Sequence, residues 1–465
     1  MKKNETVRLL GLLYESGKFR NDGHGPLYIY DDDPLGTWKK LPKEAAFQFI
    51  EEVLFNEGLL HSDVASLYTE LQYSRLFAEP KLAEPPDELL VAVENGVFNV
   101  KTKKLGKKDS HLYLRHGLHI SYRPDAELHD APTWDRYMRR SLELPTGINI
   151  SEHPKVVRLQ TSIGTTLTPL RGAKKVPVLI GATNSGKSVV LNLLARAVGE
   201  ENSISLGLPD IYDRFRTDFL GNRQVILVHE VPGKPIKRLD FLKKFVAGEP
   251  LISEAKGRQP VEIRTYGKAI MAANILPVLG EVDQGGAFAE RMLVNVFTKR
   301  EIPKTERDPG LLDKLWAERD VIFSLALDAA SALFNNKLQF PEEPEGDALV
   351  AQYKHDSDAV PRFIEDCCEK RGDDALPLGE AYETFVKYSK ENCLASGETM
   401  SRTVFRNQVA QIGYAFKKQR TRGFSNPVSC ILGLKWKKEA SSVCEQQQQK
   451  MVASPQASEP RAKKA

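Results

Sequence analysis

The chain has 465 residues and a formal net charge of +4, with 41% hydrophobic and 28% charged residues. This length exceeds what one hydrophobic core usually fills, so we expect several domains, and the composition excludes a fibrous or wholly disordered chain. No apolar run approaches the roughly 20 residues of a membrane-spanning helix, which argues against a membrane protein. The net charge is too small to indicate nucleic acid by itself, so any such argument must rest on local sequence.

Cysteine usage and the N-terminal segment both favour the cytoplasm. The five cysteines all follow residue 366, are odd in number and show no C-x-x-C pair, so neither a disulfide framework nor a zinc site is predicted. The N-terminal segment has a basic start, but its apolar stretch is short, is interrupted by Glu15 and lacks a small-residue cleavage site. We therefore expect a protein of the bacterial or host-cell cytoplasm.

The first 129 residues are expected to form a mixed α/β domain. Residues 41–77 carry apolar residues three and four positions apart, which predicts helices, and residues 88–122 contain β-branched runs punctuated by Asn95-Gly96, which predicts short strands and hairpins. In residues 27–38, LYIYDDDPLGTW, three aspartates follow a strand-like run. They could bind two metal ions in a primase site, but the pattern is more typical of a turn, and no histidine or acidic pair lies nearby.

Residues 176–194, VPVLIGATNSGKSVVLNLL, place a loop of small residues between a strand-like and a helix-like run. The loop fits the pattern G-x-x-x-x-G-K-[ST] in the context that this motif requires. In that geometry Lys187 reaches the β and γ oxygens of a nucleotide and Ser188 ligates Mg²⁺. Pro177 has no N–H, so regular strand pairing is expected to begin after it. The predicted site for ATP and Mg²⁺ consists of Gly181, Ala182, Thr183, Asn184, Ser185, Gly186, Lys187 and Ser188.

Two further strand-like runs end in polar residues. VILVHE ends in Glu230, which is placed to bind Mg²⁺ and to polarise the attacking water. AIMAAN ends in Asn274, a candidate to orient that water at the γ-phosphate. Glu230 follows Lys187 by 43 residues and precedes Asn274 by 44, so three strand ends recur at an even crossover spacing.

These motifs resemble those of the superfamily 3 helicases, in the branch found in phage and plasmid primase-helicase replication proteins. GATNSGKS resembles the Walker A motif of that family, VILVHE its Walker B motif, and KAIMAANILP its motif C with the terminal asparagine. AFAERMLVNVF resembles the segment whose arginine enters the ATP site of the neighbouring subunit. The resemblance therefore implies that Arg291 is a catalytic residue supplied in trans and that the chain forms a homo-oligomer, a hexamer.

The resemblance also implies the fold class and the domains. We expect an α/β fold with a P-loop AAA+ ATPase core, a mixed N-terminal domain and a C-terminal winged-helix domain. The expected boundaries are 1–129 for the N-terminal domain, 130–172 for a helical connector or collar, 173–300 for the ATPase core, 301–345 for a helical lid, 357–438 for the winged helix and 439–465 for a disordered tail. Within the lid, Asp308 should cap a helix with Pro309 at its first position, either one long helix or a helical pair, and residues 341–347, PEEPEGD, should form an acidic linker.

One residue departs from the family pattern. Many relatives have an acidic residue before the Walker B glutamate, whereas this chain has His229. A histidine neither ligates Mg²⁺ as a carboxylate does nor neutralises its charge. We interpret His229 as a packing residue or a support for Glu230, which must then do more of the catalytic work.

A hairpin is predicted between the second and third strand-like runs. Residues 251–255 and 261–264 can pair around a tip that carries Lys256 and Arg258. In the family it resembles, a loop here enters the channel of the ring and follows the nucleic acid backbone. Cations on a hairpin tip suit such phosphate contacts, although they are also normal on a solvated turn.

The C-terminal region predicts a second DNA contact. Ser401 is a good N-cap, Gly413 a good stop for the helix between them, and a basic hairpin follows. Nine Lys or Arg and no acidic residue lie between Arg402 and Lys438. A helix followed by a basic hairpin is the winged-helix pattern, although such a patch can also pack on an acidic neighbour. The candidate contacts are Arg402, Arg406, Lys417, Lys418, Arg420 and Arg422.

The sequence therefore predicts an ATP-dependent DNA helicase or replication initiator of a phage, plasmid or related mobile element. Single-stranded DNA would pass through the ring, duplex or origin DNA would bind the winged helix, and a separate primase is a possible partner. One alternative is an AAA+ ATPase that remodels or loads proteins on DNA without unwinding it. The other, favoured by His229, is a DNA-binding replication regulator with negligible ATP turnover.

Overall fold

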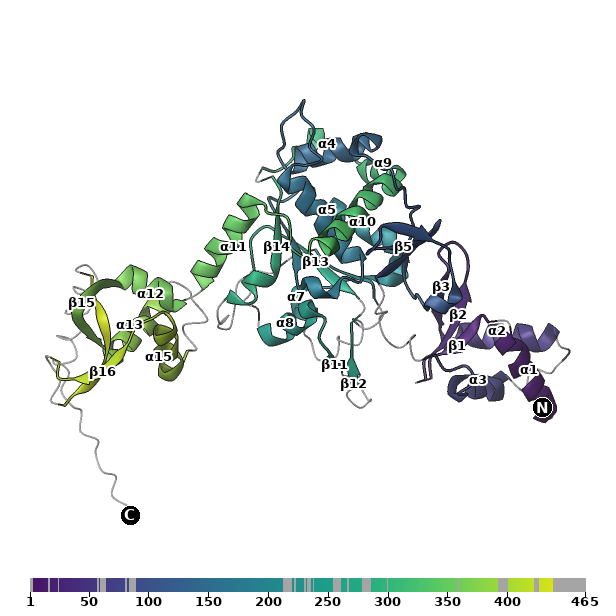
Figure 1. The fold of residues 1–465 in the computed structure, drawn as a ribbon, viewed down its shortest axis with the longest axis horizontal. Helices are drawn as coiled ribbons and strands as arrows, with labels where there is room; N and C mark the ends of the chain where they lie inside the picture. Colours follow the sequence, from purple (N-terminus) through teal and green to yellow (C-terminus); the bar gives the residue numbers. More distant parts are fainter. Residues whose placement is uncertain are drawn as a thin grey trace, which may run out of the picture. The chain divides into compact units, whose positions relative to one another are not determined.

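The computed structural model (Figure 1) divides the chain into two compact units. One consists of residues 1–234, 238–277 and 287–350, and the other of residues 235–237, 278–286 and 351–465. None of the helices in the described residues is long and apolar enough to span a membrane. The structure describes residues 3–15, 17–23, 25–56, 58, 64–79, 82, 89–211, 220, 223–229, 231, 236, 238–253, 261–265, 267–277, 286–298, 300–357, 359–391, 400–421 and 426–437.

The first unit begins with a three-stranded antiparallel sheet packed against helices. Its elements are α1 (Lys3–Glu15), β1 (Phe19–Asn21), β2 (Leu27–Asp31), β3 (Thr37–Leu41), α2 (Lys43–Asn56) and α3 (Val64–Tyr73). The predicted helices of residues 41–77 are confirmed, and their apolar positions, among them Ile50 and Leu67, are buried. Asp31 ends β2 and accepts a hydrogen bond from the Lys39 ammonium at 2.7 Å, and Asp32 and Asp33 lie in the turn to β3. The interpretation of these aspartates as a turn is therefore confirmed.

A four-stranded sheet follows, in the order β6-β5-β4-β7. The predicted turn is observed between β4 and β5, where Glu94 and Asn95 form the turn and Gly96 begins β5, paired with Val93. Two helices then lead into the central sheet. The elements are β4 (Leu90–Val93), β5 (Gly96–Asn99), β6 (Lys104–Gly106), β7 (Gly117–Leu118), α4 (Pro132–Ser141) and α5 (Pro154–Leu167).

The central sheet has five parallel strands in the order β14-β8-β13-β10-β9. Because all strands run the same way, their carboxyl ends meet at one edge. Alternate side chains such as Leu179, Leu227 and Ile270 join one hydrophobic cluster with α5, α6 and α10. The elements are β8 (Val176–Ile180), α6 (Lys187–Val198), β9 (Ser203–Ser205), α7 (Leu208–Ile211), β10 (Val225–Val228), α8 (Leu239–Ala247), β11 (Leu251–Ser253), β12 (Val261–Ile263), β13 (Lys268–Ala273) and β14 (Met292–Val296).

Two details of this sheet bear on the sequence-based expectations. Pro177 lies within β8 and stands in register with Leu293 of β14, whereas pairing with β13 starts only at Val178. Successive N–H groups of a strand point to opposite neighbouring strands. The missing N–H of Pro177 therefore removes one hydrogen bond and does not prevent pairing from starting before it. The expectation that pairing begins after Pro177 is therefore wrong for β14. The β11–β12 hairpin is confirmed, since Leu251 pairs with Ile263 in an antiparallel register.

The lid region is a helical pair, α9 (Leu311–Ala317) and α10 (Arg319–Asn335). The first helix begins two residues later than predicted. Asp308 accepts a hydrogen bond from the N–H of Gly310, which is the N-cap, so Pro309 lies in the turn and not in the helix. α10 packs on α5, as Figure 1 shows. At Gly164 the two helices approach so closely that an added Cβ would overlap the carbonyl oxygen of Ala326.

The predicted acidic linker is wrong, because a helix starts inside it. α11 (Pro344–Ser357) is initiated by reciprocal caps: Glu343 accepts from the N–H of Gly346 at 2.7 Å, and Asp347 accepts from the N–H of Glu343 at 2.9 Å. Both oxygens of Asp347 also accept from the buried Arg158 guanidinium, at 2.7 Å each. Acidic residues that look like a solvated linker in sequence thus serve as helix caps and as an anchor on α5.

In its described residues, the second unit packs the helices α12, α13 and α15 with a three-stranded antiparallel sheet in the order β15-β17-β16. Phe363, Phe385 and Phe405 form its core. The predicted caps are confirmed: Ser401 accepts from the N–H of Val404, and Gly413 adopts φ +107° just after the helix. The predicted basic hairpin is β16–β17, and the predicted tail lies outside the described residues. The elements are α12 (Ala359–Cys367), β15 (Cys368–Pro377), α13 (Leu378–Glu391), α15 (Arg402–Gln411), β16 (Phe416–Gln419) and β17 (Val428–Trp436).

Candidate functional site

The candidate phosphate loop connects β8 to α6 at the carboxyl edge of the sheet. Two of its glycines are required by geometry. Gly186 has φ +106°, and a Cβ there would also meet the Ser141 hydroxyl at 2.6 Å. A Cβ on Gly181 would meet Phe297 at 2.7 Å. Because α6 begins at Lys187, its unpaired N–H groups and the positive end of its dipole face the loop, which is the arrangement that binds phosphate.

The Lys187 side chain lies inside the curve of this loop. Its ammonium donates to the carbonyl oxygens of Gly181 at 2.8 Å and Ala182 at 2.6 Å, and to Asn274 Oδ1 at 3.1 Å. The residue is only 7% exposed, and burial lowers the pKa of the ammonium below its usual range. Its neighbour Ser188 is exposed, which leaves that hydroxyl accessible to a metal ion.

Asn274 directly follows β13 and is brought into this loop as well. Its Nδ2 donates to Thr183 Oγ1 at 3.2 Å while its Oδ1 accepts from Lys187. Since β13 pairs with both β8 and β10, its carboxyl end stands between the ends of the other two strands. The even spacing of the three motifs in the sequence thus corresponds to three neighbouring strand ends.

The candidate water-activating residue, Glu230, follows the third of these strands, β10, in the sequence. β10 is buried along its whole length and is followed by the half-buried His229. Glu230 lies outside the described residues. The carboxyl end of β10 neighbours that of β13, since Val228 pairs with Met271. This register places His229, which follows β10, on the side of Asn274 away from the phosphate loop.

A cavity of about 530 Å³ opens beside the loop. The loop and the start of α6 form one wall, the segment from Ile302 to Lys314 forms a second, and α4 forms a third. This volume lies in the range of small-molecule sites. The α4 residues that line the cavity are Thr133, Arg136, Tyr137, Arg140 and Ser141.

Contacts between α4 and the loop were missed at the level of sequence. The Tyr137 hydroxyl donates to the Gly186 carbonyl at 3.0 Å, and burial raises the pKa of this phenol. The N–H of Thr298 donates to the Ser141 carbonyl at 2.7 Å, while the carbonyl of Thr298 accepts from the N–H of Ala182 at 3.0 Å. The available signal was the periodicity of the α4 segment, in which Thr133, Tyr137 and Ser141 recur four residues apart.

Arg291 is not part of this arrangement. It ends a single 3₁₀ turn immediately before β14, and Met292 pairs with Val176 at the start of β8. Arg291 therefore lies at the amino edge of the sheet, about 16 Å of strand away from the loop of its own chain. Its guanidinium donates to the Ala287 carbonyl at 2.6 Å.

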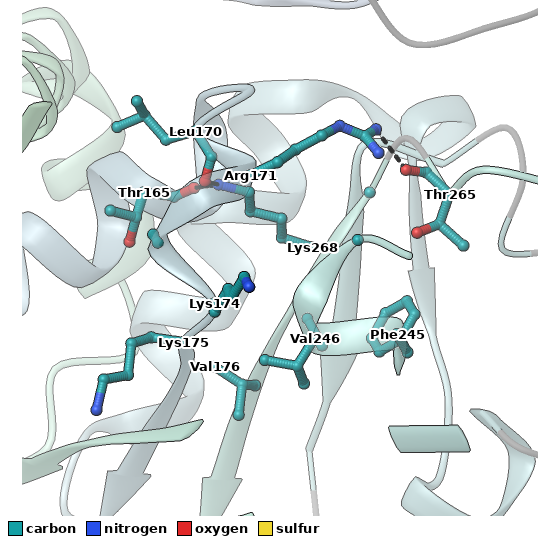
Figure 2. Close-up of a pocket in the computed structure, with 14 residues that line it drawn as sticks. Thr165, Leu170, Arg171, Lys174, Lys175, Val176, Phe245, Val246, Thr265 and Lys268 are labelled. Atoms are coloured by element: carbon teal, nitrogen blue, oxygen red, sulfur yellow. Dashed lines mark hydrogen bonds between the residues drawn. The ribbon is translucent and has the colours of Figure 1, made fainter. Parts of the chain in front are cut away.

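The amino edge of the sheet holds a second, small cavity of about 30 Å³ (Figure 2). Figure 2 shows Lys268 running toward the carbonyl oxygens of Thr165 and Leu170, to which its ammonium donates, and Arg171 reaching the Thr265 carbonyl. Burial and the nearby Arg171 charge lower the pKa of Lys268 to about 7. The cavity has room for about one water molecule, so these side chains serve the structure and no ligand site is indicated.

Lys268 is expected to make stability depend on pH. Its folded pKa of about 7 is below the unfolded value of 10.5, so between these values the unfolded chain binds the extra proton and stability rises with pH. Urea unfolding should show a gain of about 2 kcal/mol between pH 7 and 9 that Lys268→Met loses. Lys174→Met, a change in an exposed neighbouring lysine, should keep the gain. Equal pH slopes for the parent and Lys268→Met would contradict the assignment.

The candidate DNA contacts are only partly within the described residues. Lys256, Arg258 and Arg422 lie outside them. In the second unit, the guanidinium carbon of Arg406 on α15 lies 5.1 Å from the centroid of the Phe416 ring on β16, so the helix contacts the hairpin. Of the candidate contacts, Arg402, Arg406, Lys417, Lys418 and Arg420 are described, and their side chains are exposed.

Three family descriptions match separate segments of the chain. Residues 61–143 match one described as D5 N terminal like, residues 179–291 match a family of unknown function (DUF5906), and residues 355–436 match one described as Poxvirus D5 protein-like. No curated protein sequence matches the chain. The first segment contains α4, and the second contains the phosphate loop.

Solved structures of the C-terminal region of NrS-1 share the fold. The apo structure of its residues 305–718 is 13% identical with a TM-score of 0.50, and the match covers 93% of this chain and 100% of that chain. An A form apo structure of this region is 12% identical with a TM-score of 0.48, and the match covers 91% and 98%. The chain thus has a mixed α/β fold of several sheets, and two of its segments, residues 61–143 and 355–436, are similar to D5-type domains.

Proposed function

We propose that the protein is an ATP-dependent DNA helicase or replication initiator of the superfamily 3, AAA+ type, encoded by a phage, plasmid or related mobile element. The observation that carries the proposal is the convergence of Lys187 and Asn274, 87 residues apart, in one hydrogen-bonded phosphate loop. A glycine-rich turn with no role in nucleotide binding would not need the side-chain amide of Asn274, the residue that follows β13. The central strand order supports the same assignment, because it inserts β13 between the strand of the loop and the strand before Glu230.

The roles proposed for the site follow from charge and position. Lys187 and the N–H groups at the start of α6 hold the β- and γ-phosphates. Ser188 and Glu230 hold Mg²⁺, which when bound neutralises phosphate charge. Glu230 polarises the attacking water, and Asn274 orients it at the γ-phosphate. Arg291 completes the site of a neighbouring subunit in a ring.

Two basic surfaces support action on DNA. The β11–β12 hairpin would present Lys256 and Arg258 to single-stranded DNA in the ring channel. The capped helix α15 and the β16–β17 hairpin have the order of a winged helix, with exposed cations on both elements. Contacts of this kind hold the phosphate backbone and carry no sequence information. A separate primase could act on the strand that such a ring releases.

A strand-displacement assay tests the proposal. With Mg²⁺ and ATP the protein should release a labelled strand from a forked duplex, and without ATP it should not. Changing Lys256 and Arg258 together to Ala should abolish unwinding and spare duplex binding, because those cations would contact only the strand in the channel. Changing Lys417 and Lys418 together to Ala, a matched loss of two charges, should instead weaken duplex binding.

The alternatives predict other outcomes. ATP hydrolysis without strand release would favour an ATPase that remodels or loads proteins on DNA. DNA binding with neither hydrolysis nor strand release would favour a replication regulator, to which the half-buried His229 after β10 points. Equal unwinding by the parent and the Lys256/Arg258 variant would remove the hairpin from the mechanism.

A further inference from the structure

A complete face of α4 is turned toward the nucleotide cavity. The lining residues Thr133, Arg136, Tyr137, Arg140 and Ser141 are spaced i, i+3, i+4, i+7 and i+8, which is one side of an α-helix. α4 precedes the phosphate loop by more than forty residues in the sequence, and it lies in the segment that matches the D5 N terminal like family. The cavity therefore contains a wall that none of the nucleotide motifs encodes.

The two ends of α4 are held by different walls of the cavity. At its start, the N–H of Thr133 donates to the Glu318 carboxylate, between α9 and α10, at 2.9 Å. At its end, Ser141 is tied through Thr298 to Ala182 in the loop. α4 thus runs from the lid helices to the phosphate loop, and its middle already contacts the loop through the hydrogen bond from Tyr137 to Gly186.

The cavity also has apolar walls. Val189 follows Ser188 on α6, and Pro309, Leu311 and Leu312 come from the turn before α9 and from its first turn. A slot lined by apolar side chains and continuous with a phosphate cradle suits the flat faces of a nucleobase.

The charges around the cavity single out Arg136. Lys187 belongs to the phosphate loop, and three further cations that line the cavity are each held by a carboxylate. The pairs are Arg140 with Glu306 at 2.6 Å, Arg307 with Glu301 at 2.7 Å and Lys314 with Asp308 at 2.6 Å. Arg136 is exposed and has no ion pair within the part of the chain that the structure describes.

We infer that the α4 face is the nucleoside wall of the site and that Arg136 lays its guanidinium plane against the base of the bound nucleotide. A planar, weakly hydrated cation stacks well on an aromatic face, and the apolar residues of α6 and α9 complete the slot. The inference rests on the proposed function, since it names the contact for the nucleoside of the same ATP. In this inference the nucleotide site is formed by two parts of the chain, the segment with α4 and the central sheet with its phosphate loop.

Calorimetric titration with ATP, ADP and inorganic tripolyphosphate tests this contact. Arg136→Ala should weaken the binding of ATP and of ADP by the same factor, about tenfold, as expected for the loss of one desolvated cation–π contact. Tripolyphosphate, which has no base, should bind as it does to the parent. Arg136→Lys should remain weakened for ATP, because it restores the charge without the planar group.

Two controls separate this contact from other effects. Lys187→Ala should weaken the binding of both ATP and tripolyphosphate. Arg75→Ala, which removes an exposed arginine after α3, should change the affinity for neither. Parental ATP affinity in Arg136→Ala would overturn the inference, and so would an equal loss for tripolyphosphate, which would make Arg136 a phosphate ligand. If the parent itself bound neither ATP nor tripolyphosphate, the proposed function would fail, and the inference would fail with it.

Discussion

Glu230→Gln is expected to bind ATP like the parent and to lose hydrolysis by about two to four orders of magnitude, because the amide cannot take a proton from the attacking water. Lys187→Ala should instead lose ATP binding, since its ammonium lies inside the phosphate loop. Equilibrium binding of a fluorescent ATP analogue and steady-state phosphate release distinguish the two variants. Their opposite behaviour is the largest single-residue effect that the proposed site predicts.

Glu249→Gln, a change in an exposed carboxylate after α8, is the matched control and should affect neither measurement. If Glu230→Gln hydrolyses ATP at the parental rate, the water-activating role belongs to another residue. His229→Asp, which restores the acidic position of the resembled family, then shows whether the residue before Glu230 limits the rate.

Mixing two inactive variants is expected to restore ATP hydrolysis. Lys187→Ala subunits lack a working phosphate loop but present Arg291, and Arg291→Ala subunits present the converse. In a head-to-tail ring assembled from equal amounts, about a quarter of the interfaces would pair an intact loop with an intact arginine. Phosphate release should therefore return to on the order of a quarter of the parental rate, while each variant alone stays nearly inactive.

The position of Arg291 makes this result a test of assembly. Because Arg291 precedes β14 and the phosphate loop follows β8, a parallel sheet keeps the two on opposite edges within one chain. The double variant Lys187→Ala/Arg291→Ala mixed with Lys187→Ala should show no recovery, since no interface then has an intact loop. A first mixture as inactive as its components, with subunit exchange confirmed by labelling, would favour a structural role for Arg291 within its own chain, where it donates to the Ala287 carbonyl.

Local signals predicted the elements that local contacts determine. Ser401 and Gly413 bound α15 through hydrogen bonds and backbone angles that involve only near neighbours, so their residue types were sufficient. The strand, turn and helix of residues 176–198 were predicted for the same reason. The approach of Asn274 to Lys187 was predicted because parallel strands bring their carboxyl ends to one edge whatever the intervening sequence does.

Contacts between distant segments were not predictable in this way. The segment around Glu343 and Asp347 was interpreted as a linker because its partner Arg158 is almost two hundred residues earlier in the chain. The hydrogen bond from Tyr137 to Gly186 likewise depends on how α4 is placed, and an amphipathic pattern does not specify which surface a helix covers. The helix begins at Leu311 and not at Pro309 as predicted, because Asp308 caps a turn that precedes the helix.

The close approach of α5 and α10 makes the nucleotide cavity sensitive to a residue outside it. Gly164 leaves no space for a methyl group against Ala326, so any larger residue must push α10 away from α5. α9, which directly precedes α10 in the chain, contributes Leu311 and Leu312 to the cavity. A displacement of the helical pair would thus widen or narrow the slot while every residue in contact with the nucleotide stayed the same. If the cavity binds ATP as proposed, substitutions at the helix crossing would tune its affinity and leave the motifs of the loop unchanged.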